Sequence, residues 1–232
     1  MRLARFSFFI LCLPCFGQTS KDVASVKEAG KLMANHYQKS LGYSSRLFNG
    51  RAYSIYQPQK EEHPYLYTDW TEGEINYDNH KFDSVLLLYD LSIDELVTKY
   101  FNSDDILLTR NKVSYFILKD RKFVLLNGTV LPNGFYELLY DGTTKVYSQR
   151  KKKFIEKITS SEVDRNFEEK VTYFVYAKGN YHTVKSKRSF LKIFPEQQAE
   201  LKKFIRGRGL QFGETLNITL VYLMQFYDRL QK

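Results

Sequence analysis

"YELLYDGTTKVYSQRKKK", residues 136–153, contains the signal that decides the fold. Asp141-Gly142 separates two runs rich in Tyr, Leu and Val, and such a pair accepts the backbone angles of a tight turn between antiparallel strands. The stretch therefore predicts a β-hairpin. It ends on four consecutive cations from Arg150 to Lys153. Because neighbouring side chains of a strand alternate between its faces, we expect at least half of these cations to point away from any single flat partner.

Three further turns of the same kind interrupt β-prone runs, at Asp78-Asn79, Lys119-Asp120-Arg121 and Lys178-Gly179-Asn180. Successive hairpins favour an antiparallel β-meander, which we expect over residues 47–186 as a curved sheet or a barrel-like one. A lipid-facing barrel is disfavoured because "KDRKF" and "QRKKK" interrupt the apolar band that its outer surface requires.

Both ends of the chain carry apolar residues at helical spacing. Residues 18–42 predict one N-terminal helix, and residues 187–232 predict two to three C-terminal helices. In the latter, Leu201, Phe204 and Ile205 share one face. The expected fold class is therefore α+β, with residues 18–232 forming a single domain.

The first 17 residues read as a secretory signal peptide. Arg2 and Arg5 precede an apolar run over residues 6–16, and Gly17 is a small residue suited to cleavage. Both cysteines lie in this segment, so the exported chain would hold no disulfide. We expect a periplasmic, outer-envelope-associated or secreted protein without a transmembrane segment after cleavage.

Charge is unevenly distributed along a chain whose formal net charge is +9. Glu61 to Glu95 holds ten acids and one cation, whereas Lys145 to Arg208 holds 17 cations and seven acids. The basic segment favours a binding role toward a partner protein or an anionic surface. In a cell envelope such surfaces are lipid headgroups, lipopolysaccharide and acidic glycans. Nucleic acid is not expected as a partner of an exported chain.

Four stretches carry a resemblance to a known group of proteins: "NGRAYSIY", "FDSVLLLYDLSIDELVTKY", "NGFYELLYDGTTKVYSQRKKK" and "SFLKIFPEQQAELKKFIRGRGLQF". Together they resemble small exported proteins of Bacteroidota bacteria, over nearly all of the chain that follows residue 17. The resemblance implies export and a β-rich fold. None of the motifs is a catalytic signature, and no activity is assigned to that group, so function stays open.

The sequence lacks the residues and motifs that several classes of enzyme require. No cysteine follows residue 17, no G-x-S-x-G or phosphate-binding glycine loop occurs, and the four histidines are scattered. We therefore expect no catalytic triad, no metal and no cofactor.

The leading hypothesis is a non-enzymatic, exported envelope protein that binds a partner or an anionic surface. Its candidate binding residues are Arg150, Lys151, Lys152 and Lys153. The alternative is a glycan-binding module that uses the aromatic and acidic region around Tyr65, Tyr67, Asp69 and Trp70. A glycoside hydrolase is a weaker alternative, because no local spacing sets the distance between two catalytic acids.

Overall fold

The computed structural model describes residues 47, 49–56, 63–99, 105–128, 130–158 and 163–231. The chain divides into two units, residues 1–43 and 44–232, and every described residue lies in the second. The expected signal peptide (1–17) and N-terminal helix (18–42) lie outside the described residues, and both stay predictions.

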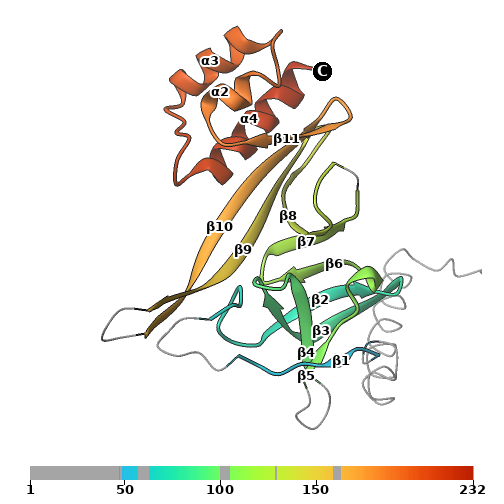
Figure 1. Cartoon of the computed structure of the whole chain (residues 1–232). Helices are drawn as coiled ribbons and strands as arrows, with labels where there is room; N and C mark the ends of the chain where they lie inside the picture. The colour runs from blue at the N-terminus through green and yellow to red at the C-terminus, as the bar shows by residue number, and fades with distance from the viewer. Residues whose placement is uncertain are drawn as a thin grey trace, which may run out of the picture. The chain divides into compact units, whose positions relative to one another are not determined.

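Eleven strands form one antiparallel sheet (Figure 1) in the order β1-β5-β4-β3-β2-β6-β7-β8-β9-β10-β11. The strands are β1 (Arg51–Ala52), β2 (Thr71–Tyr77), β3 (His80–Asp90), β4 (Glu95–Lys99), β5 (Asp105–Leu107), β6 (Val113–Leu118), β7 (Arg121–Leu126), β8 (Gly134–Asp141), β9 (Lys145–Ile158), β10 (Val163–Ala177) and β11 (Asn180–Val184). A 3-10 turn, η1 (Arg110–Lys112), precedes β6.

The expected fold class, α+β built on one continuous meander, is wrong. The structure is mostly a single large antiparallel sheet with about 20% helix. Across the sheet, the strands run in reverse chain order from β5 to β2 and in chain order from β6 to β11. The change occurs at β2, which pairs with β3 on one side and β6 on the other. α-Helices appear in the described residues only from Lys187 onward, and they cover part of the sheet instead of forming a layer of equal extent.

The four predicted hairpins are confirmed. Asp78 and Asn79 both have positive φ, 51° and 61°, between β2 and β3, as do Lys178 and Gly179, 51° and 79°, between β10 and β11. Such angles twist the turn in the same sense as the two strands it joins. The other two predicted turns join β6 to β7 and β8 to β9.

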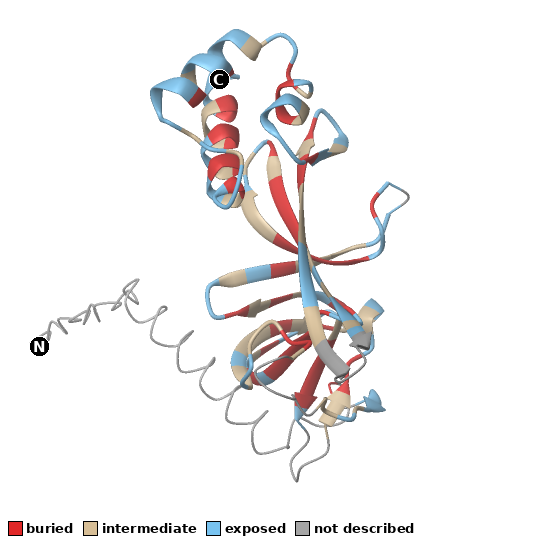
Figure 2. Ribbon diagram, turned by 60° about the vertical axis from the view of Figure 1, so that its left-hand side comes forward, coloured by how far each residue is buried: buried red, intermediate tan, exposed pale blue. Residues whose placement is uncertain are grey.

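Three helices, α2 (Lys187–Leu191), α3 (Gln198–Gly207) and α4 (Leu216–Leu230), pack together beside β8–β11. We call residues 185–231 the helical cap. A capping box between Ser186 and Ser189 starts α2. One core cluster joins the cap to the sheet, and it includes Val146, Val175, Phe190, Phe194, Leu201, Leu220, Leu223 and Met224. The inner side of α4 is correspondingly buried (Figure 2).

Aromatic rings fill the core around β3, β6, β7 and β8. Tyr89 makes edge contacts with Phe116, Phe123 and Phe135 at centroid distances of 5.2, 5.4 and 5.9 Å. Phe116 stacks on Phe123 at 4.8 Å. Offset and edge-on rings are the favoured arrangements of buried aromatics, and each such pair contributes about 1 kcal/mol beyond its buried area.

β9 and β10 extend beyond their neighbours. β8 pairs with β9 only up to Ser148, and β11 pairs with β10 only from Tyr173 onward. Residues 149–158 and 163–172 therefore form a two-stranded ribbon (Figure 1), and this ribbon carries the run of four cations.

Candidate functional site

The four cations of the ribbon alternate in exposure. Lys151 and Lys153 are exposed, whereas Arg150 and Lys152 are half-buried. The alternation follows from the period of two along a strand, and it confirms the expectation that the run cannot act as one flat surface.

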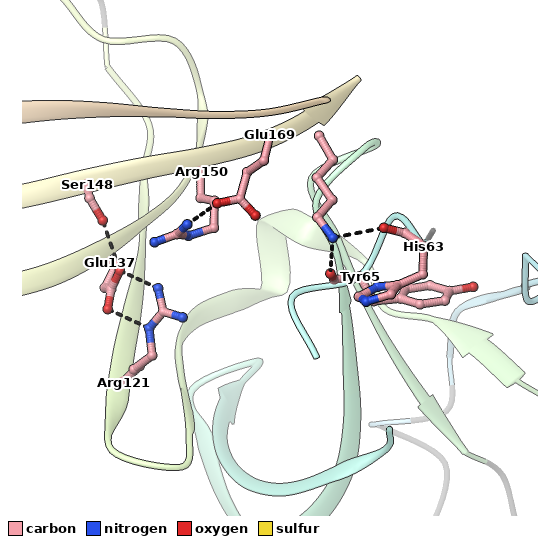
Figure 3. A network of polar contacts seen from close by, with 8 residues as sticks. His63, Tyr65, Arg121, Glu137, Ser148, Arg150 and Glu169 are labelled. Carbon is pink, nitrogen blue, oxygen red and sulfur yellow. Dashed lines mark hydrogen bonds and ion pairs between the residues drawn. The ribbon is translucent and has the colours of Figure 1, made fainter. Parts of the chain in front are cut away.

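Arg150 and Lys152 are used within the protein. The Arg150 guanidinium forms an ion pair with Glu169 on the neighbouring strand β10. Lys152 Nζ donates to the carbonyl oxygens of His63 at 2.9 Å and Tyr65 at 3.1 Å. Half of the predicted cationic site thus stabilises the fold (Figure 3).

Lys152 brings together the two regions that the sequence suggested as separate sites. Its ammonium binds the chain at His63 and Tyr65, which lie four and two residues before Tyr67. Its backbone N–H also donates to the carbonyl oxygen of Leu91 at 3.2 Å. The ribbon therefore lies against the segment that leads into β2.

Tyr65 belongs to the core and does not present a binding face. Only 3% of its surface is exposed. Its hydroxyl accepts from the Tyr56 N–H at 2.7 Å and lies 3.4 Å from the Tyr53 hydroxyl, which in turn donates to Asp90 at 2.6 Å. Burial is the main cause that raises the pKa of Tyr65.

Tyr67, Asp69 and Trp70 line one depression of about 580 Å³. The remaining lining residues are His63, Leu66, Thr68, Thr71, Glu72 and Lys119. The structure therefore gathers three of the four residues proposed for glycan binding.

Cations cover the aromatic rings of this depression. Lys119 Nζ lies 3.9 Å from the centroid of the Tyr67 ring, and Lys99 Nζ lies 5.0 Å from that of Trp70. Each ring thus has one face in a cation–π contact, which reduces the flat area open to a sugar.

A second polar cluster lies beside Arg150, and no sequence motif predicts it. Arg121 donates from Nε and Nη2 to the two carboxylate oxygens of Glu137, each at 2.6 Å, and Ser148 Oγ donates to Glu137 at 2.9 Å (Figure 3). Burial raises the pKa of Glu137, but the hydrogen bonds and charge of Arg121 outweigh it and lower that pKa overall. The carboxylate is held ionised.

Metal binding finds no support in the part of the chain that the structure describes. There, no group of three or more His, Cys, Asp or Glu side chains could hold an ion. His80 Nδ1 lies 2.7 Å from the carbonyl oxygen of Asp78, and His63 Nε2 lies 3.3 Å from Thr68 Oγ1.

The helical cap carries the densest exposed positive charge. Eight cations lie between residues 185 and 208, against the acids Glu196 and Glu200. All eight are exposed: Lys185, Lys187, Arg188, Lys192, Lys202, Lys203, Arg206 and Arg208. The excess of basic residues from Lys145 to Arg208 is the signal in the sequence that points to them.

No helix in the described ranges has both the length and the apolar character that a membrane span requires. No protein-family model, curated protein or solved structure matches the chain.

Proposed function

We propose that this chain is a non-enzymatic protein of the cell envelope that attaches to anionic lipid headgroups through its helical cap. The observation that carries this proposal is the set of eight exposed cations between residues 185 and 208, opposed by only two acids. Export, and residence in the envelope, are part of the proposal and rest on the expected signal peptide.

Helix α3 provides a continuous part of this basic surface. Lys202 and Arg206 are four residues apart and Lys203 and Arg206 are three apart, so their side chains are neighbours on one side of the helix. The opposite side of α3 is anchored in the core by Leu201 and Ile205.

The buried apolar side of α3 determines the kind of contact. A helix that lies in a membrane interface inserts its apolar face among the lipids, but that face of α3 is already covered. Attachment through α3 is therefore electrostatic, with each cation near the surface contributing about 1 kcal/mol. Salt should weaken it strongly, because the screening length is about 10 Å at 0.1 M and about 3 Å at 1 M.

The test compares two triple variants with equal loss of charge. The cap variant replaces Lys202, Lys203 and Arg206 by Gln, and the ribbon variant replaces Lys151, Lys153 and Lys170 by Gln; all six side chains are exposed. Binding to phosphatidylcholine vesicles with and without phosphatidylglycerol is measured by co-sedimentation. Loss of three cations from the contact should weaken binding about 100-fold in the cap variant and much less in the ribbon variant.

Two results would contradict this proposal. Equal weakening in both variants would mean that overall charge, and not the cap, attracts the vesicles. Binding that is absent, or that persists unchanged when salt is raised, would exclude an electrostatic attachment through the cap.

Saccharide binding in the depression beside β2 is the second candidate function. Its support is the convergence of Tyr67, Asp69 and Trp70 with Thr68 and Glu72 on one hollow. Aromatic rings with hydrogen-bonding acids suit a hydroxyl-rich ligand.

A glycan array probed with the wild type, Trp70→Ala and Tyr222→Ala tests this candidate. Tyr222 is a matched aromatic control because it is 51% exposed on α4. We expect Trp70→Ala to lose at least tenfold in affinity and Tyr222→Ala to bind as the wild type does. Equal binding by all three proteins, or no binding at all, would rule out this hollow as the site.

A further inference from the structure

A separate pocket of about 320 Å³ lies between the sheet and the start of α4. Its lining residues are Asp120, Arg121, Glu137, Leu139, Ser148, Arg150, Tyr173 and Asn217. All but Leu139 are polar or can form a hydrogen bond. The pocket shares no lining residue with the depression beside Trp70 and none with the eight cations of the helical cap.

The floor of the pocket is a row of side chains across three strands. Glu137 on β8 is registered with Ser148 on β9, and Ser148 is registered with Tyr173 on β10. Registered residues project from the same face of a sheet. Glu137 and Ser148 are 8% and 3% exposed, so this floor is built into the fold.

Mutual hydrogen bonds hold the floor in a fixed arrangement. Glu137 receives both Arg121 bonds and the Ser148 bond on its two oxygens. A carboxylate has room for about four such bonds, so Glu137 can still accept one from a ligand. Arg121 Nη1 takes no part in the pair.

Arg150 lines this pocket, and part of its guanidinium forms no hydrogen bond with the described residues. Its ion pair with Glu169 uses Nη1 only, and its Nε has no hydrogen-bond partner among the described residues. An unsatisfied, water-shielded donor costs about 1–3 kcal/mol. The Nε–Nη2 edge of a guanidinium matches the two oxygens of a carboxylate.

We propose that this pocket binds a small carboxylate that also carries hydroxyl groups, of the kind that a uronic acid represents. The carboxylate pairs with the Arg150 guanidinium, whose buried Nε is uncovered by a shift of the side chain, and the hydroxyl groups exchange hydrogen bonds with Glu137, Tyr173 and Asn217. The volume corresponds to about ten water molecules, at about 30 Å³ each, which suits one sugar ring. The ligand satisfies the Arg150 donor that the fold leaves without a partner.

Isothermal titration calorimetry with glucuronate and glucose tests the proposal, because the two probes differ only at C6, which is a carboxylate in glucuronate and a hydroxymethyl group in glucose. Glucuronate should bind the wild type at least tenfold more tightly than glucose. Arg150→Gln should lose at least tenfold in affinity for glucuronate. Lys170→Gln, which removes an exposed cation from the same ribbon, should bind glucuronate as the wild type does.

Asn217→Asp provides a second variant that does not disturb the ion pairs. It places a carboxylate at the pocket wall with almost no change in size, and an acid in the first turn of α4 is favourable for the helix. Repulsion should lower glucuronate affinity at least tenfold more than the substitution changes glucose affinity.

Three outcomes would overturn the proposal. The first is equal affinity for the two sugars, or no binding of glucuronate. The second is unchanged glucuronate binding in both Arg150→Gln and Asn217→Asp, with thermal unfolding showing that both variants are folded. The third is loss of glucuronate binding in Trp70→Ala alone, which would place the ligand in the other depression. None of these results depends on whether the helical cap binds vesicles.

Discussion

At the scale of single residues, Glu137 has the best-defined environment of the acids near the ribbon. Its side chain is 10% exposed and that of Arg121 is 22% exposed. Removing one member of such a pair leaves the other charge partly buried with fewer partners. Glu137 and Arg121 therefore stabilise the fold chiefly as a unit.

Glu137→Gln should lower the free energy of unfolding by about 3 kcal/mol at pH 7. The pKa of Glu137 is lower in the folded chain than its usual value, so its stabilising contribution is complete above the unfolded pKa and is lost as pH falls through the folded one. Urea unfolding at pH 7 and pH 3 should show the difference between wild type and variant shrinking at acid pH. A stability difference between wild type and variant that does not change with pH would contradict the stabilising role of the ionised Glu137 side chain.

The sequence anticipates the exposure of single residues better than their partners. Alternation along a strand correctly separates Lys151 and Lys153 from Arg150 and Lys152. It could not show that Lys152 binds the carbonyl oxygens of His63 and Tyr65, because contacts across nearly 90 positions depend on how the strands are ordered. For the same reason it could not show that Tyr65 is buried.

At the scale of elements, one aspartate joins the last helix to the hairpin formed by β8 and β9. Asp228 of α4 accepts hydrogen bonds from the Thr144 N–H at 3.1 Å, the Thr144 hydroxyl at 2.9 Å and the Tyr140 hydroxyl at 3.0 Å. Gly142 makes this possible, since a Cβ there would collide with the Asp228 carboxylate. The turn and the helix thus fit together through side chains 84 or more positions apart.

Asp228→Ala should destabilise the fold by about 3 kcal/mol, because the buried Thr144 donors lose their acceptor. Tyr140→Phe removes one of the three bonds and should cost about 1 kcal/mol. Chemical denaturation of both variants measures these values. Equal effects of the two substitutions, or a neutral Asp228→Ala, would show that this junction does not hold α4 to the sheet.

Hairpins are the elements that the sequence predicts well. Asp78-Asn79 and Lys178-Gly179 adopt left-handed backbone angles. Asn, Asp and Gly tolerate such angles, so the turn residues alone indicate a hairpin. The order of strands in the sheet, in contrast, does not depend on a few neighbouring residues. β2 has two strand neighbours, and nothing in "EINYDNHKF" distinguishes a terminal strand of a meander from one placed between β3 and β6.

At the scale of the whole molecule, the expected balance of helix and sheet is wrong because about half of the described residues lie in strands and only about 20% of the structure is helix. The sheet buries its own aromatic side chains, such as Tyr89, Phe116 and Phe135, and needs helices only beside β8–β11. The candidate sites likewise differ in how far the sequence predicts them. The basic segment could be read from composition, whereas the pocket at Glu137 requires side chains from four strands, one turn and one helix.

The reversal of strand order at β2 has a consequence for how the chain folds. β2–β5 and β6–β11 are two sets of mostly neighbouring strands, and the pairing of β2 with β6 is the ladder that joins them. Each set can close through short loops, whereas the joining ladder must bring Tyr77 and Val113 together at a larger entropic cost. We therefore expect the β2–β6 ladder to form later in folding than the hairpins within each set.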